Sequence, residues 1–193
     1  MNTSARDRGL GLLFLAAFPL YGVGSALLVT KSAGLGLTLV LANSLVVLAI
    51  GRILHAIVLP YARVVAHLYL AARILEALLL GVSGGLVYQA GIADAGAPYY
   101  RIAMIILGIA SLPLLGVLMR VGRMPAWLSW FGIVGYSVFV LGIVADGFGA
   151  VGFGLFLVIP GALFEVTFAV WLIVRGFARE PQEPTEPSDP QLP

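Results

Sequence analysis

The chain has no cysteine at any of its 193 positions. Disulfide bridges, iron–sulfur clusters and catalysis by a thiolate are therefore excluded. Charge is scarce as well, because Asp, Glu, Lys and Arg make up 10% of the residues. A typical soluble domain carries about 25%. A chain of this composition lacks the charged side chains to cover a surface that faces water on all sides.

Apolar residues, at 61% of the sequence, gather in long runs. A helix needs about 20 such residues to cross a bilayer core, whereas a closed β-barrel needs short alternating segments. Six runs reach the helical length: roughly 9–29, 34–59, 64–88, 99–119, 126–145 and 151–174. They predict an all-α, six-helix transmembrane bundle with residues 1–179 forming one membrane domain. The first run exceeds the ~7–15 apolar residues of a cleaved signal, so we expect a retained helix.

Orientation is predicted from the Lys and Arg residues near the ends of the spans, which are enriched on the cytoplasmic side. One side carries Arg6, Arg8, Arg63, Arg120, Arg123, Arg175 and Arg179. The other side carries Lys31 and Arg101. This asymmetry predicts cytoplasmic N- and C-termini. Trp127 and Trp130 fit an aromatic belt at the inner interface. An outer belt is expected from Tyr88, Tyr99 and Tyr100.

Residues 180–193 repeat Pro and Glu and have no apolar face. This composition predicts a disordered, extended cytoplasmic tail. No basic run with interleaved aromatic residues occurs, so nucleic acid is not expected as a partner. The partner that the sequence requires is the lipid bilayer.

Ionisable residues inside a span are costly and normally face the interior of the bundle. Arg73 lies ten residues after Arg63, and Glu165 lies ten residues before Arg175. At 1.5 Å per residue, both are about 15 Å from the cytoplasmic edge. The third and sixth spans therefore carry opposite charges at one depth, where the two side chains are expected to meet.

Further polar residues extend this predicted cluster. Glu76 and Tyr69 are three and four residues from Arg73, so they share its helix face. Arg52 is placed at the inner edge of the cluster, and Asn43 lies farther out. Two arginines and two glutamates balance in charge, as burial requires. The sequence leaves three roles open for the cluster: a structural pin between helices, a ligand or ion site, and a proton relay.

His55 and His67 flank the turn at Pro60 at similar depth. Opposed imidazoles can bind a metal or haem, but two histidines without a third protein ligand make a poor zinc site. Interfacial histidines that bond to loops or headgroups are the favoured interpretation, with no metal and no cofactor. No G-x-S-x-G or H-E-x-x-H pattern occurs either, so no catalytic residue is predicted.

Three segments together resemble a bacterial family of membrane proteins, domain of unknown function 4386 (DUF4386). They are 68–77 (LYLAARILEA), 124–132 (MPAWLSWFG) and 165–177, which ends in WLIVRGF. Each is short and apolar, so the resemblance rests on their combination and order. It implies six helices in a bacterial cytoplasmic (inner) membrane. It also places Arg73, Glu76 and Glu165 at family motif positions, and it implies no activity.

Three functional hypotheses follow from the sequence. The first is a protein that binds or moves a small ligand through the polar cluster. The second is a structural or regulatory subunit that docks a larger membrane-protein complex. The third is an intramembrane acid–base enzyme using Glu76 or Glu165, which lacks a recognisable nucleophile. A water-accessible cavity reaching Arg73 and Glu165 would favour the first hypothesis, and a dry, tightly packed cluster would count against it.

Overall fold

The computed structural model describes residues 5–149 and 153–178. Within these ranges the chain forms helices and no strand. The elements are α1 (Ala5–Leu27), α2 (Ala33–Val58), α3 (Arg63–Ala90), the 3-10 turn η1 (Ala93–Gly96), α4 (Ala97–Arg120), α5 (Ala126–Gly147) and α6 (Phe153–Val174). The predicted all-α architecture with six spans is confirmed. The predicted tail, 180–193, lies outside the described residues.

Turn-forming residues set the ends of these helices. Gly91 follows α3 with a φ of 65°, a left-handed conformation that a residue without Cβ adopts at little cost. Pro98 lies in the first turn of α4, where its missing N–H leaves no helical bond unmade. Pro125 precedes α5 in an extended conformation. The apolar runs are thus separated by residues that end or start helices.

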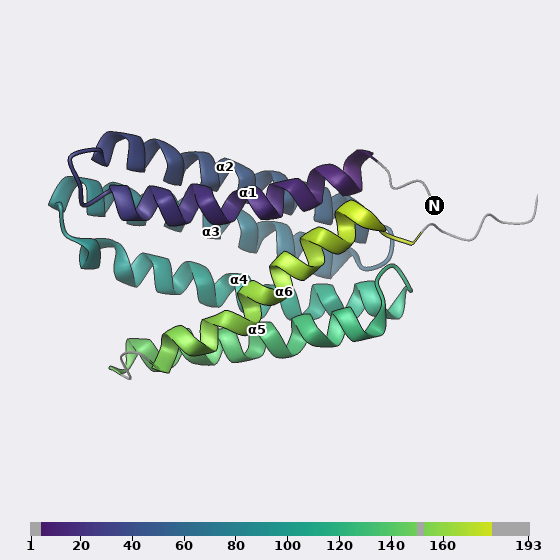
Figure 1. The fold of residues 1–193 in the computed structure, drawn as a ribbon. Helices are drawn as coiled ribbons and strands as arrows, with labels where there is room; N and C mark the ends of the chain where they lie inside the picture. The colour runs from purple at the N-terminus through teal and green to yellow at the C-terminus, as the bar shows by residue number, and fades with distance from the viewer. Residues whose placement is uncertain (1–4, 150–152, 179–193) are drawn as a thin grey trace, which may run out of the picture.

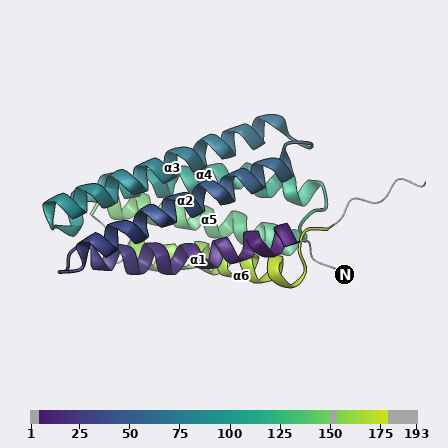
Figure 2. The ribbon, with the colours of Figure 1, turned by 90° about the horizontal axis from the view of Figure 1, so that it is seen from above.

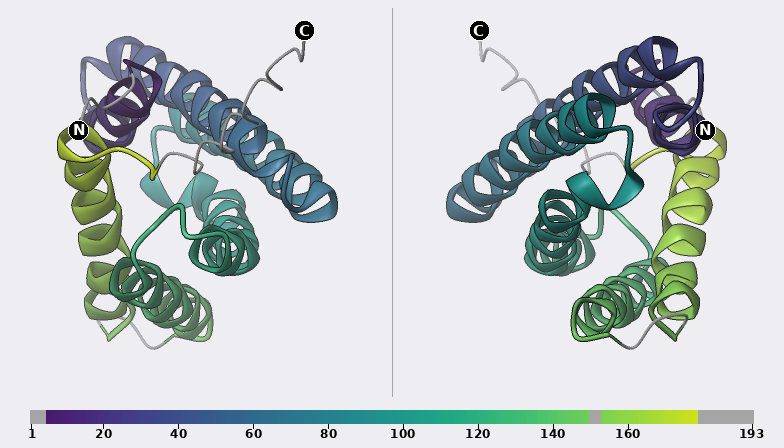
Figure 3. Two further views of the ribbon diagram at one scale, coloured as in Figure 1. Left: turned by 90° about the vertical axis from the view of Figure 1, so that its right-hand side faces the viewer. Right: turned by 90° about the vertical axis from the view of Figure 1, so that its left-hand side faces the viewer.

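Each helix packs against the next along the chain, and α1 also packs against α6, so the six helices close into a ring (Figures 2 and 3). At the end of the bundle where α6 finishes, the Phe14 and Phe168 rings are 5.5 Å apart. Gly11 approaches α6 so closely that a Cβ there would lie 2.6 Å from the Ala169 carbonyl oxygen. Toward the opposite end α1 and α6 diverge, because α1 stays packed along α2 and α6 stays packed along α5 (Figure 1).

The outside of the ring is apolar. Large hydrophobic side chains are exposed along the helices, among them Leu12, Leu45, Leu78, Ile109, Leu141 and Leu163. Such a surface is unfavourable in water and is the normal contact with lipid. All six helices are long and apolar enough to cross a bilayer. The chain is therefore a multi-pass helical membrane protein.

The start of α1 and the finish of α6 lie at the same end of the bundle, which we call the basic end. Polar contacts join several helix ends there. Arg123 donates from Nε to Tyr61 Oη (3.1 Å) and from Nη1 to the Ala178 carbonyl (2.5 Å). The Phe177 amide donates to Asp7 Oδ2 at 3.3 Å. This end carries Arg6, Arg8, Arg63, Arg120, Arg123 and Arg175, and the opposite end carries Lys31 and Arg101. That the basic end faces the cytoplasm stays a prediction.

Candidate functional site

Three polar side chains on α3 point into the bundle. Tyr69, Arg73 and Glu76 share one helix face and are 2–3% exposed. Arg73 donates from Nη1 to Glu76 Oε2 (2.9 Å) and from Nε to Tyr69 Oη (2.8 Å). Its guanidinium carbon lies 5.2 Å from the centre of the Tyr69 ring and 5.9 Å from that of Phe14. The charge of Arg73 is thus matched by one carboxylate and two aromatic rings.

A glycine on the neighbouring helix makes room for this arginine. Gly51 on α2 lies opposite Arg73, and a Cβ at this position would be 2.6 Å from Arg73 Cβ. Real Cβ atoms do not approach so closely, so any larger residue would push α2 away from α3. The glycine therefore allows the arginine to be buried between two closely packed helices.

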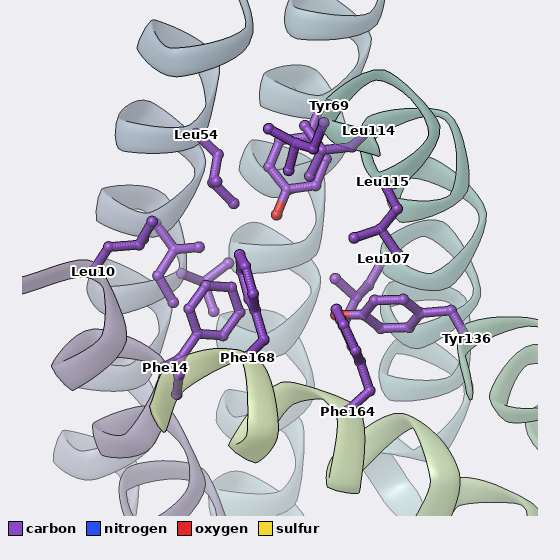
Figure 4. Close-up of a cluster of buried hydrophobic side chains, with 14 of the residues drawn as sticks. Leu10, Phe14, Leu54, Tyr69, Leu107, Leu114, Leu115, Tyr136, Phe164 and Phe168 are labelled. Carbon is purple, nitrogen blue, oxygen red and sulfur yellow. The ribbon is translucent and has the colours of Figure 1, made fainter. Parts of the chain in front are cut away.

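Polar groups from α2, α5 and α6 face the same region. Glu165 on α6 is half-buried, and its Oε1 accepts a hydrogen bond from Tyr136 Oη on α5 at 2.7 Å. Asn43 on α2 is 3% exposed, and its Oδ1 has no hydrogen-bond partner among the described residues. Figure 4 shows the hydroxyls of Tyr69 on α3 and Tyr136 on α5 directed toward the middle of the bundle. The centre of the ring therefore holds several buried polar groups.

These groups line a cavity of about 330 Å³, which we call the central cavity. All six helices contribute to its wall. The polar part of the wall includes Asn43, Arg73, Glu76 and Glu165. The aromatic part consists of Phe14, Phe18, Tyr21, Tyr100, Tyr136 and Phe139. The volume lies at the lower end of the roughly 300–1,000 Å³ typical of small-molecule sites, and a mostly apolar wall with a few polar groups is also typical.

The rim of the central cavity lies between α1 and α6. Phe18 and Gly22 form it on α1, and Val158 and Ala162 form it on α6. Each of these residues is partly or fully exposed. They belong to the part of the bundle in which α1 and α6 diverge (Figure 1). The cavity therefore opens at the side of the bundle, where lipid lies.

A second cavity of about 180 Å³ lies farther toward the opposite end, with Ser25 and Ser83 in its wall. Tyr21 and Tyr100 line both cavities. Their rings stack with centres 5.5 Å apart and an angle of 12° between the planes. This tyrosine pair, Tyr21 with Tyr100, is the shared wall between the two cavities.

The predicted cluster and the observed one differ in two respects. Arg73 and Glu165 line one cavity, but no ion pair joins them among the described residues, because Arg73 is paired with Glu76. Arg52 is exposed and is not part of the described wall of the cavity. It follows Gly51 directly, and one residue rotates a side chain by about 100° around the helix. That rotation turns Arg52 away from α3.

His55 and His67 do lie side by side, as their equal depth suggested. Their ring centres are 5.1 Å apart in an edge-to-face arrangement. His67 Nδ1 is 2.7 Å from the Arg63 carbonyl oxygen, one turn back in the same helix. In the described part of the chain no three His, Asp or Glu side chains gather as metal ligands do. The contact packs α2 against α3 next to their turn.

The tyrosine pair was missed by reasoning from the sequence. Tyr99 and Tyr100 were both expected in an outer aromatic belt, yet only Tyr99 is exposed, whereas Tyr100 turns inward onto Tyr21. Adjacent helical residues point about 100° apart, so two neighbours cannot both face lipid squarely. The adjacency of Tyr99 and Tyr100 in the sequence could therefore have indicated that one of the two faces the interior. Asp146 pairs with Arg101 at 3.0 Å, a contact between α5 and α4 that was not predicted either.

Residues 92–176 match the model of a family described as Domain of unknown function (DUF4386). Within these residues the chain is similar to the DUF4386 family. The match confirms the resemblance seen in the sequence, and it covers two of the three segments that carried it, 124–132 and nearly all of 165–177. Of the cavity wall, the matched residues include Tyr100, Tyr136 and Glu165, whereas Arg73 and Glu76 precede the match. Comparisons with curated proteins and with solved structures gave no match.

Proposed function

We propose that the protein binds a small, partly apolar molecule in the central cavity, where Arg73, Glu76 and Glu165 hold its polar group. One observation carries the proposal: charged side chains inside the bundle line a space of about 330 Å³. A cluster that only pinned α3 to α6 would be packed without such a space. The cavity between Arg73 and Glu165 thus supports binding over the structural role.

The composition of the wall supports the same function. Aromatic and aliphatic side chains supply contact area for an apolar body, and a few polar groups fix its orientation. The cavity-lining residues of the rim, on α1 and α6, are at least partly exposed at the side of the bundle, so a molecule dissolved in the bilayer would reach the cavity there without crossing water. The ligand is therefore expected to partition into lipid.

Passage of the ligand through the bundle is a second candidate function. It is favoured by the second cavity, which continues from the central one behind Tyr21 and Tyr100. Movement of either ring would join the two spaces and extend them toward the opposite end of the bundle. Catalysis is less well supported, because the described wall holds carboxyl groups and tyrosines but no Ser, Thr or His.

Filling the cavity tests the proposal. Ala17 lines the central cavity, and Ala71 lies exposed on the lipid-facing side of α3. Ala17→Phe places a ring in the cavity, and Ala71→Phe adds the same ring outside it as a matched control. Each protein is transferred from its native membrane into lipid nanodiscs and examined by native mass spectrometry for small molecules that stay bound.

We expect a stoichiometric bound molecule in the unmodified protein and in Ala71→Phe, and its loss in Ala17→Phe. Filling a mere packing defect raises stability and changes nothing else. An Ala17→Phe protein that is more heat-stable and retains the same molecules would therefore contradict the proposed function.

A further inference from the structure

We propose that the ligand is an amphiphilic amine, whose protonated nitrogen binds at Glu165 and whose apolar body occupies the aromatic part of the central cavity. This inference rests on the proposed function and names the chemical class of its ligand. Four features of the cavity point to it: the balance of charge, the engagement of Arg73, the unpartnered acceptors and the aromatic wall.

The described wall of the central cavity carries more negative groups than positive ones. Its ionisable carboxyls are Glu76 and Glu165, and its one basic side chain is Arg73. Arg52, which would have restored the balance, is exposed outside this wall. With both carboxyls ionised, the site holds one uncompensated negative charge inside the bundle. An uncompensated buried charge is strongly unfavourable, and a cationic ligand removes it.

The surplus charge belongs to Glu165. Arg73 is already bonded to Glu76 at 2.9 Å and to Tyr69 at 2.8 Å, and two aromatic rings lie against its guanidinium. Glu165 receives one hydrogen bond among the described residues, from the neutral hydroxyl of Tyr136. A tyrosine hydroxyl orients the carboxylate without neutralising it. The remaining Glu165 oxygen is therefore the natural contact of a ligand cation.

Further acceptors face the same cavity. Glu76 Oε1 and Glu165 Oε2 accept no hydrogen bond from the described residues. The buried Asn43 Oδ1 has no partner among them either, although its side chain is 3% exposed and lines the cavity. Of these three oxygens, Asn43 Oδ1 is fully buried, and such an acceptor without a partner costs free energy until a donor arrives. A primary ammonium offers three donors and no acceptor, which suits three acceptors in one cavity.

Aromatic rings complete the match. Six aromatic side chains line the cavity, from Phe14 on α1 to Phe139 on α5. Their faces attract a cation as well as an apolar surface. The described wall offers an anionic ligand no unpaired basic side chain, because Arg73 is paired with Glu76. The partly exposed rim between α1 and α6 would admit the apolar body from the lipid.

Three probes of nearly the same size and shape test the inference: phenethylamine, which is protonated at neutral pH, 2-phenylethanol, which is neutral, and phenylacetate, which is an anion. Binding of each to the full chain in lipid nanodiscs is measured by calorimetry, with empty nanodiscs subtracted. The same measurements are made on Glu165→Gln, which keeps an acceptor for Tyr136 and removes the charge, and on Glu165→Asp, which keeps the charge.

We expect phenethylamine to bind about tenfold or more tightly than 2-phenylethanol, and phenylacetate to bind most weakly. Glu165→Gln should weaken the amine about thirtyfold and leave the alcohol unchanged, and Glu165→Asp should retain the preference for the amine. Equal binding of amine and alcohol, tighter binding of the anion, or no binding of any probe would overturn the amine as ligand.

The series on the unmodified protein decides the inference even if Glu165→Gln fails to fold. Equal binding of amine and alcohol would mean that a proton on Glu165 already removes the surplus charge. The proposed function fails separately, when Ala17→Phe retains the molecules that the unmodified protein carries.

Discussion

Arg73 donates a 2.9 Å hydrogen bond to Glu76, one turn along its own helix, and both side chains face Glu165 of α6 across a shared cavity. The charge of Arg73 is thus satisfied within α3, so α6 is not held to α3 by an ion pair among the described residues. Glu165 remains available on the opposite wall. Arg73 and Glu76 thus neutralise each other in the cavity wall, whereas the charge of Glu165 is left for a ligand to neutralise.

The first prediction concerns this pair. Arg73→Leu should destabilise the protein by about 3–5 kcal/mol, because it leaves Glu76 buried without its partner. Adding Glu76→Leu should recover most of the loss, whereas adding Glu165→Leu should not. Unfolding by increasing SDS, followed by tryptophan fluorescence, measures all three variants. Greater recovery with Glu165→Leu than with Glu76→Leu would show that the ion pair spans α3 and α6 after all.

The second prediction concerns the glycine that admits the arginine. Gly51→Ala should lower the unfolding temperature, because the new Cβ would lie 2.6 Å from Arg73 Cβ and force α2 and α3 apart. Gly85→Ala on α3 is the matched control, since nothing lies within 4 Å of a Cβ there. Alanine favours a helix over glycine by about 1 kcal/mol, so the control should be neutral or stabilising. Equal effects at both positions would contradict close packing at Gly51.

The third prediction concerns the tyrosine pair. If the ligand passes through the bundle, which is the second candidate function, Tyr100→Ala should join the central and second cavities and speed dissociation of bound phenethylamine. Tyr100→Phe keeps the ring that stacks on Tyr21 and should leave the rate unchanged. Stopped-flow displacement in nanodiscs gives both rates. A Tyr100→Ala rate within twofold of the unmodified protein would contradict passage through the second cavity and leave the rim between α1 and α6 as the route of exit.

The fourth prediction concerns orientation. Because the chain has no cysteine, a single introduced thiol reports one position alone. Ser32→Cys lies at the opposite end and Val121→Cys at the basic end, and both positions are exposed. In intact cells a membrane-impermeant maleimide should label Ser32→Cys and spare Val121→Cys until the cells are opened. The reverse pattern would place both termini outside and refute the inference from basic residues.

The number of helices could be predicted from the sequence because crossing a bilayer imposes a local requirement. A run such as 34–59 has the length and apolarity of a span whatever its neighbours are. The shared face of Tyr69, Arg73 and Glu76 could be predicted for the same reason, since it follows from helix periodicity alone. The match to DUF4386 over 92–176 was likewise visible in short segments of sequence.

The sequence by itself thus determined the six spans, the apolar exterior and the polar face of α3, all of which depend on residues close together in the chain. Only the tertiary structure decided that Glu165 accepts a hydrogen bond from Tyr136 instead of pairing with Arg73, that Arg52 lies outside the cavity wall, and that Tyr21 stacks on Tyr100. Depth in the membrane fixes one coordinate of a side chain. The rotation of each helix about its axis and the angle between α1 and α6 fix the others, and these depend on packing among all six helices.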